Sequence, residues 1–203
     1  GEFVEGYEKL AAIGPCISIF GSARTHPENK FYKLAEDISQ AIVERGYGVI
    51  TGGGPGIMEA ANKGAKKAKG SAIGLSISLP FEQSGNEWIS EDLEINFHYF
   101  FMRKFWFLYK AKAMVVWPGG FGTLDEVMET LTLIQTQKLR KKIPIVLYDE
   151  NFWKNIVNWD FMVEKGVISE SDIDFFKFCN SVDSAFKYLT EKITSTHLKG
   201  PNF

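Results

Sequence analysis

Residues 117–126, with the sequence WPGGFGTLDE, combine three glycines with a carboxylate at a predicted junction between a strand and a helix. The apolar run at 113–116 before them is typical of a buried parallel strand. After them, apolar residues recur at helical spacing through Ile134. Glycines at such a turn leave main-chain N–H groups uncovered, and the start of the helix adds partial positive charge. The pattern favours an anion site, most often for a phosphate, with the Glu126 carboxylate one turn into the helix beside it.

A purely structural role is open for the same residues. Thr123 and Glu126 have the spacing of a capping box, in which two side chains satisfy N–H groups at the start of a helix. The ten residues alone therefore do not decide between a catalytic Glu126 and a structural one.

Two cations, Arg103 and Lys104, lie within the aromatic run FFMRKFW at residues 100–106. Charged groups among aromatic side chains are costly unless they face water or a partner. An arginine directed into the same cleft could pair with Glu126 or with a substrate, whereas a surface carboxylate could equally hold it. The spacing leaves both alternatives open.

Two further glycine-rich turns follow predicted strands, Gly21-Ser22-Ala23-Arg24 and the run GGGPG at residues 52–56. In open parallel sheets, ligands bind beyond the carboxyl ends of the strands, which is where all three turns are expected. A single glycine turn is weak evidence, because chain reversal itself often needs glycine. The three turns together favour an elongated small molecule that carries a phosphate.

Several well-known site patterns are absent from the sequence. Neither the dinucleotide fingerprint G-x-G-x-x-G nor the P-loop pattern occurs at these turns, which disfavours a standard dehydrogenase or ATPase. No G-x-S-x-G element is present. The three histidines, His26, His98 and His197, are scattered and do not have the spacing of metal ligands, so no metal site is expected.

Apolar runs of strand length alternate with helical patterns along the chain. Strands covered on both faces are apolar throughout, so this alternation predicts an α/β fold, a Rossmann-like three-layer α/β/α arrangement with a mainly parallel sheet of about seven strands. Strands are predicted at 16–20, 47–51, 72–78, 93–97, 113–116, 144–148 and 175–179, and helices at 4–14, 31–45, 57–69, 101–112, after 126, at 152–165 and after 181.

The length of 203 residues predicts a single domain, with a lead-in at 1–14, a Rossmann-like core at 15–190 and a tail at 193–203. With a formal net charge of −2, the chain has no overall field that would attract nucleic acid or a membrane. No run approaches the roughly 18 apolar residues of a membrane span, and no secretory signal pattern is present, so a cytoplasmic location is expected. Cys16 and Cys179 lie in apolar runs and are expected to be buried.

Several motifs resemble those of the LOG family, the cytokinin-activating phosphoribohydrolases long labelled as possible lysine decarboxylases. Residues 118–126 match the family signature P-G-G-x-G-T-x-x-E. The resemblance covers about residues 15–190. The other similar segments are the first glycine turn at 21–24, the second at 52–58, the Arg-Lys element at 102–104 and the run LTLIQT at 131–136, which resembles the larger bacterial branch of the family.

The resemblance implies hydrolysis of the N-glycosidic bond of a nucleoside 5′-monophosphate, such as AMP, to a free base and ribose 5-phosphate. It implies no cofactor. By the same resemblance, Arg103 and Glu126 form the catalytic pair. The implied substrate-binding residues are Gly21, Ser22, Arg24, Gly53, Gly54, Met58, Lys104, Gly119, Gly120, Gly122 and Thr123.

The residue types suit this reaction. Breaking a ribosyl C–N bond builds positive charge on the sugar, as in glycoside hydrolysis, and an ionised Glu126 can stabilise that charge or position the attacking water. Arg103 is expected to lower the pKa of Glu126, and so to keep it charged and oriented. A phosphate held away from the reacting bond would fix the sugar in place.

Three points stay open at this stage. A substituent on the adenine amino group, as in cytokinin nucleotides, would need an apolar pocket, for which the aromatic residues at 100–106 are candidates, although core or interface roles suit them equally. A second class of function is a nucleotide or nucleotide-cofactor carrier of the same fold that performs no turnover. The resemblance also implies a homodimer or higher oligomer, with the aromatic helix at 101–109 as the candidate contact.

Overall fold

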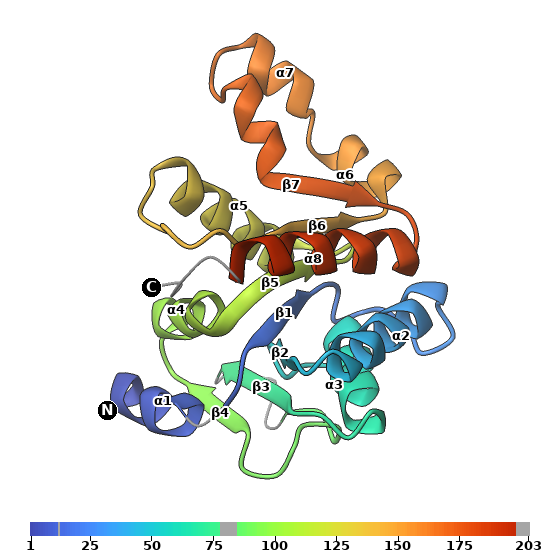
Figure 1. The fold of residues 1–203 in the computed structure, drawn as a ribbon, viewed down its shortest axis with the longest axis vertical. Helices are drawn as coiled ribbons and strands as arrows, with labels where there is room; N and C mark the ends of the chain where they lie inside the picture. The colour runs from blue at the N-terminus through green and yellow to red at the C-terminus, as the bar shows by residue number, and fades with distance from the viewer. Residues whose placement is uncertain (12, 78–84, 198–203) are drawn as a thin grey trace.

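The computed structural model describes residues 1–11, 13–77 and 85–197. These residues form a seven-stranded sheet in the order β4-β3-β2-β1-β5-β6-β7, in which every neighbouring pair is parallel (Figure 1). The predicted number and direction of the strands are therefore confirmed. The strands are β1 Cys16–Phe20, β2 Gly48–Thr51, β3 Ala72–Ile77, β4 Glu94–Phe97, β5 Ala111–Val116, β6 Ile145–Tyr148 and β7 Phe176–Cys179.

The strand order reverses beside β1. The chain runs outward from β1 through β2 and β3 to β4, and then returns to the other side of β1 as β5. The helices that follow the two strands at the reversal, α2 (Lys30–Glu44) after β1 and α5 (Phe121–Gln135) after β5, lie on opposite faces of the sheet, and such a reversal leaves a crevice at the carboxyl ends of the strands. Main-chain hydrogen bonds join the two turns, from Trp117 to the carbonyl of Phe20 (2.9 Å) and from Ser22 to that of Pro118 (3.0 Å).

Helices cover both faces of the sheet, as the apolar strands predict (Figure 1). One apolar core lies between the sheet and a layer that includes α1, α4 and α5, and the other lies between the sheet and α2, α3 and α8. The helices are α1 Glu2–Ala11, α2 Lys30–Glu44, α3 Ile57–Lys67, α4 Phe100–Lys110, α5 Phe121–Gln135, α6 Glu150–Ile156, α7 Trp159–Glu164, the 3₁₀ helix η1 Glu170–Phe175 and α8 Val182–His197.

Burial along the strands follows their position in the sheet. The central strands β1 and β2 are buried along their whole length, because helices cover both of their faces. The edge strand β4 alternates instead. Its residues Ile95 and Phe97 are buried, whereas Glu94 and Asn96 are exposed on the other face.

Some element boundaries differ from those predicted. The predicted helix at 152–165 is two helices, α6 and α7, because the Asn158 side chain accepts a hydrogen bond from the main-chain N–H of Phe161 (3.0 Å) and starts a new helix. Strand β5 begins at Ala111, so residues 111 and 112, which were predicted to end the preceding helix, belong to the strand.

Both cysteines are buried, as their apolar surroundings predict, and both are free thiols. Burial raises the pKa of the Cys16 thiol to about 12, so this group is not a reactive thiolate at neutral pH. Within the described ranges, no helix is both long and apolar enough to cross a bilayer.

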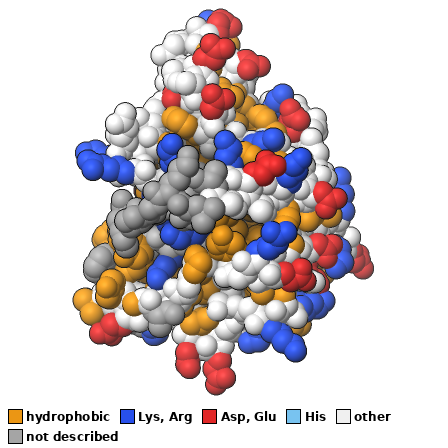
Figure 2. Space-filling model, in the orientation of Figure 1, with side chains coloured by type: hydrophobic (Ala, Val, Ile, Leu, Met, Phe, Trp, Pro, Cys, Tyr) orange, Lys and Arg blue, Asp and Glu red, His pale blue; other side chains and the backbone are white. Residues whose placement is uncertain are grey.

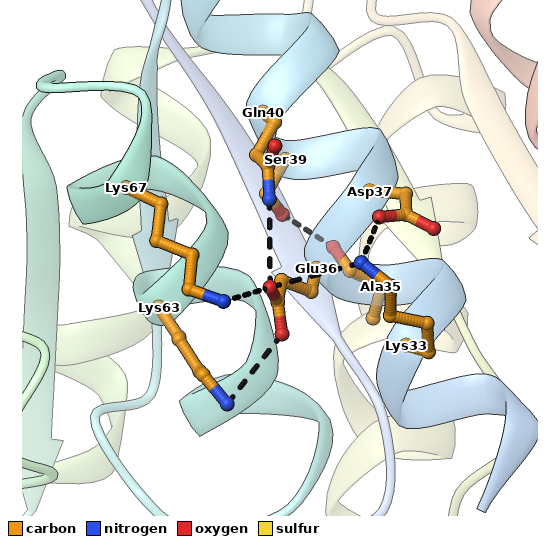
Figure 3. A network of polar contacts seen from close by, with 8 residues as sticks. All are labelled: Lys33, Ala35, Glu36, Asp37, Ser39, Gln40, Lys63 and Lys67. Carbon is orange, nitrogen blue, oxygen red and sulfur yellow. Dashed lines mark hydrogen bonds and ion pairs between the residues drawn. The ribbon is translucent and has the colours of Figure 1, made fainter.

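Helices α2 and α3 pack closely around a buried carboxylate, Glu36, which is only 4% exposed. Figure 3 shows three lysines converging on it, with Lys67 Nζ at 2.6 Å, Lys63 Nζ at 3.6 Å and Lys33 Nζ at 3.8 Å. Gly64 permits the close packing, because a Cβ there would meet the carbonyl oxygen of Glu36. Burial alone would raise the pKa of Glu36, but the Lys67 hydrogen bond and the three positive charges together lower it.

We expect Glu36→Gln to lower the free energy of unfolding at pH 7 by about 1–2 kcal/mol, because the lysines lose a buried partner but stay partly solvated. A carboxyl group with a lowered folded pKa stabilises the fold above its ordinary pKa of 4.5, and this contribution disappears as the pH falls through the lowered value. Urea unfolding of the variant and the wild-type protein should therefore converge at acid pH. The control is Glu44→Gln, an exposed carboxylate on the same helix, and an equal loss in both variants would contradict the prediction.

Candidate functional site

A cleft of about 630 Å³ opens at the carboxyl end of the sheet, within the usual size range of ligand pockets. Its walls come from the ends of five adjacent strands, β4, β3, β2, β1 and β5, and from the turns that follow them. It therefore includes the point beside β1 at which the strand order reverses. The predicted site residues that line it are Gly21, Ser22, Arg24, Gly53, Gly54, Met58, Arg103, Gly120, Gly122, Thr123 and Glu126.

The turn before α5 brings main-chain N–H groups to the cleft. Helix α5 begins at Phe121 with Gly120 as its N-cap residue, so the helix starts earlier than the sequence pattern indicates. A Cβ built at Gly120 or Gly122 would meet no atom within 4 Å. The packing of the fold therefore does not require glycine at these two positions, and their backbone stays open to the cleft at the positive end of the helix.

The capping-box alternative is wrong. Because Gly120 is the N-cap residue, Thr123 is the third residue of the helix and Glu126 the sixth. The Thr123 side chain packs against Gly119, where a Cβ would meet its hydroxyl oxygen. Gly119 is therefore required by packing and is not a lining residue of the cleft.

The glycine turn after β2 takes a backbone shape that favours glycine. Gly53 and Gly56 have φ angles of +76° and +68°, in the region that other residues rarely adopt. At Gly56 a side chain would also meet the main chain of Ser22 and Ala23 in the turn after β1. The two turns are thus in direct contact, and Ile57 at the start of α3 donates its N–H to the carbonyl of Ser22 (3.1 Å).

A network of buried hydrogen bonds holds the glycine turn after β2 in place. The hydroxyl of Thr51 donates to Asn62 (2.6 Å) and accepts from the N–H of Gly53 (3.0 Å). The side-chain amide of Asn86 donates to the carbonyls of Gly53 and Gly54, both at 3.1 Å. Sequence reasoning missed Asn86, because it lies in a polar segment without periodicity and meets the turn only in the folded chain.

Glu126 is 6% exposed and lines the cleft. Burial raises its pKa to about 7, although the charges of Lys104 and Arg103 act to lower it, and those of Asp125 and Glu129 add to the increase. Arg103 acts to lower the pKa of Glu126, as predicted, but the increase that burial causes is larger. Glu126 is therefore half protonated near neutral pH instead of being held fully ionised.

The two adjacent cations of α4 have different surroundings. Arg103 lines the cleft, and its guanidinium lies over the rings of Phe100 (5.2 Å) and Phe107 (5.5 Å). Lys104 is not among the lining residues. Its ammonium group contacts Asp125 (2.7 Å) and Glu129 on α5, so it acts on Glu126 through its charge.

Part of the cleft wall was not identified from the sequence. Of the candidate aromatic residues at 100–106, Phe100 lines the cleft and Trp106 is buried in the core. Among the lining residues that were missed, those at the carboxyl end of a predicted strand, such as Ser76 and Ile77, had that position as their only signal. Glu94 is the first residue of β4 and had none. The lining residues missed at the β3 and β4 side are Ser76, Ile77, Glu94 and Asn96, and those missed elsewhere include Phe20, Phe107 and Phe121.

The arrangement provides uncovered N–H groups, two arginines and a buried carboxylate in one cleft. It can hold a phosphate-bearing molecule and exchange a proton with it or with water near neutral pH. Over residues 1–11, 13–77 and 85–197, no group of three or more His, Cys, Asp and Glu side chains is placed to hold a metal ion.

Known proteins share both the sequence pattern and the fold. The family model described as "Possible lysine decarboxylase" matches residues 58–189. A rice protein named "Probable cytokinin riboside 5'-monophosphate phosphoribohydrolase LOG4" is 26% identical over 179 residues, which are 86% of this chain and 76% of the rice protein.

Two solved structures illustrate the likeness in fold. The molybdenum cofactor binding protein of Rippkaea orientalis superposes with a TM-score of 0.65 at 22% identity, over 90% of this chain and 99% of that one. The molybdenum cofactor carrier protein of Chlamydomonas reinhardtii gives 0.63 at 21% identity, with the same coverage. These two structures show the fold alone, whereas the family match rests on the sequence itself. The chain therefore belongs to the LOG family, whose model carries the older description of a possible lysine decarboxylase.

Proposed function

We propose that this protein is a phosphoribohydrolase that hydrolyses the N-glycosidic bond of AMP, or of AMP substituted on its amino group, to a free base and ribose 5-phosphate. The observation that carries the proposal is the position of Glu126, a buried carboxylate in the same cleft as the glycine turn that starts its helix. A phosphate bound at Gly120 and Gly122 would place the attached sugar beside this carboxylate. The relatives named as phosphoribohydrolases support the same reaction.

The reaction breaks the bond between C1′ of the ribose and the base nitrogen, and water adds to C1′. Ionised Glu126 would stabilise the positive charge on the sugar and accept a proton from the attacking water, while the departing base gains a proton. A pKa of about 7 suits a group that must accept a proton at neutral pH. Arg103, on α4, would pair with negative charge on the substrate or with Glu126.

The apolar part of the cleft suits a base with or without a substituent. Phe100 and Phe121 line it with exposed rings, 51% and 93% exposed. An apolar substituent on the amino group would cover the Phe100 ring and gain from its burial. Unsubstituted AMP remains the simplest substrate to test.

A nucleotide-cofactor carrier is the alternative, because the two superposed structures are named as binding or carrying molybdenum cofactor. A carrier needs the phosphate cradle but has no need for a carboxylate that titrates near pH 7 beside the sugar. Incubation with AMP and chromatography of the products separates the two functions. Free adenine supports hydrolysis, whereas bound AMP without adenine release supports a carrier.

We expect Glu126→Gln to lower the rate of adenine release from AMP by at least about 100-fold, because the amide keeps the size of the side chain but can neither ionise nor accept the proton. Binding of AMP, measured by calorimetry, should change by only a few-fold. Glu164→Gln removes an exposed carboxylate on α7 and serves as the matched control, with unchanged turnover. Normal adenine release by Glu126→Gln would exclude the carboxylate from the reaction.

The pH dependence of both rate and stability should report on Glu126. The pKa of Glu126 is about 7 in the folded protein and about 4.5 in the unfolded chain. Between these two pH values the folded protein holds a proton that the unfolded chain has lost. The free energy of unfolding therefore falls as the pH rises from 4.5 to 7. At about 1.4 kcal/mol per pKa unit, the loss is about 3 kcal/mol and is complete above pH 7. Denaturant unfolding of Glu126→Gln should lack this loss. Adenine release by the wild-type protein should increase over the same interval, and a rate independent of pH from 5 to 8 would count against an ionised Glu126.

We also propose that α4 forms a contact between copies of this chain, as the family resemblance implies. Helix α4 and its N-cap residue expose five aromatic side chains, and exposed apolar patches commonly mark contact sites between proteins. Figure 2 shows hydrophobic side chains grouped where α1 and α4 lie in Figure 1. Phe100 belongs both to this surface and to the cleft wall, so the two are continuous. The exposed residues are Tyr99, Phe100, Phe101, Phe105 and Tyr109.

Light scattering at micromolar concentration should give at least twice the monomer mass. Phe101→Glu places a charge in the centre of the aromatic surface and should shift the protein toward the monomer. Phe161→Glu makes the same change at an exposed ring on α7 and should leave the mass unaltered. A wild-type monomer, or an equal response of the two variants, would refute the contact through α4.

A further inference from the structure

A second carboxylate, Glu94, lies in the cleft wall at the end farthest from the glycine turn of α5. Its Oε1 accepts a hydrogen bond from the hydroxyl of Ser76 (3.0 Å) on the neighbouring strand and another from the N–H of Gly85 (2.7 Å). The side chain is therefore held in one orientation by two donors. Asn96 lines the same wall on the same face of β4.

The sheet order sets the distance between the two ends of the cleft. Strand β4 is at the edge and β5 is four strands away, which at about 4.8 Å per strand is on the order of 19 Å between strand axes. A phosphate and a free base are each too small to contact both ends. An elongated ligand such as a nucleotide can reach from one end toward the other.

The charges at the two ends of the cleft determine which part of such a ligand suits each end. The start of α5 is positive and carries uncovered N–H groups, which suits the phosphate. At the other end the Glu94 carboxylate would repel a phosphate but accepts hydrogen bonds from N–H donors. The base of a nucleotide, and not its phosphate, is the part that suits the β4 end.

We propose that Glu94 determines base specificity, by accepting an N–H from the exocyclic amino group of the base. The proposal rests on the proposed function for the identity of the ligand as a nucleoside monophosphate. It selects 6-aminopurine nucleotides over 6-oxopurine nucleotides, because a carbonyl oxygen at the same position would face the carboxylate with no proton between them. A single substituent on the amino group leaves one N–H, so substituted adenines are still accepted.

Ser76 and Gly85 act as positioning groups in this arrangement. They occupy one oxygen of Glu94 and orient the carboxylate before the ligand arrives, which lowers the entropy lost on binding. Loss of the Ser76 hydroxyl should therefore weaken the discrimination without removing the carboxylate that provides it.

The test compares AMP with IMP, which differ in the amino and oxo groups at position 6. Calorimetry should show that the wild-type protein binds AMP about 10- to 100-fold more tightly, the range expected for one hydrogen bond to a charged acceptor. In Glu94→Gln the ratio should fall to near one, because the amide can donate to the oxo group as well as accept from the amino group. Ser76→Ala should give an intermediate ratio, and Glu91→Gln, an exposed neighbour outside the cleft wall, should keep the wild-type ratio.

Binding and turnover separate this proposal from the proposed hydrolysis. A preference for AMP that is lost in Glu94→Gln supports the role of Glu94, even where chromatography finds no free base and the hydrolysis proposal fails. Adenine release with an AMP-to-IMP ratio unchanged in Glu94→Gln overturns the role of Glu94 and leaves hydrolysis standing. A wild-type protein that binds the two nucleotides equally, or binds neither, also overturns it. Circular dichroism of each variant confirms that it is folded, and Ser76→Ala provides a second test that leaves Glu94 in place.

Discussion

Parallel pairing of β1 with β2 on one side and β5 on the other places the functional residues together. Because parallel strands all end at the same edge of the sheet, the turns after β1, β2 and β5 must meet there, although their sequences are about 30 to 95 residues apart. Main-chain hydrogen bonds then join the turn after β1 to the other two. The positive ends of α3 and α5 both follow from this geometry, since each helix starts directly after a turn at this edge. The meeting of two positive helix ends at the cleft is therefore a property of the strand order more than of any one side chain.

The pKa values of two buried carboxylates, Glu36 and Glu126, are shifted in opposite directions within the same fold. Glu36, between α2 and α3, has three lysines as partners, and its pKa is lowered. Glu126 also has two cations nearby, but one of them is shared with Asp125 and Glu129, and burial prevails, so its pKa is raised. A fully paired carboxylate supports the fold and stays ionised at neutral pH. A buried carboxylate with partial compensation costs stability above pH 7, which is a common feature of sites that must exchange protons.

Local sequence features predicted much of this arrangement. The strands were visible as short apolar runs, and the glycine turns as interruptions at their ends, so the position of Glu126 at one edge of the sheet followed from the order of the elements. The position of Arg103 in the same cleft was implied only by the family resemblance, because its spacing fits a surface ion pair equally well. The first residue of α5 could not be predicted from the sequence. Its N-cap residue is a glycine, which has no side chain by which to recognise the start of a helix, whereas Thr123 is a residue type that often caps helices. Asn86 and Glu94 were missed for another reason, because each meets partners that are distant in sequence only in the folded chain. Glu94 meets Ser76 across the paired strands β4 and β3, and Asn86 meets the glycine turn after β2 from an irregular segment. The net shift in the pKa of Glu126 could not be predicted either, since it depends on how deeply the carboxylate is buried relative to the charges around it.

The separation of the cleft into two ends also bears on how one fold serves different functions. A glycine turn at one end and a polar strand edge at the other can hold a nucleotide whether or not any bond is broken, so these features suit a carrier as well as a hydrolase. On the proposed function, what distinguishes the two is the Glu126 carboxylate. Contacts at the two ends would hold the sugar beside Glu126, and the binding energy of the phosphate and the base would be used to bring the reacting bond to the carboxylate. A chain that kept both ends but lacked such a titrating group would bind the same ligand without hydrolysing it, so the proposed chemistry depends on the environment of a single side chain.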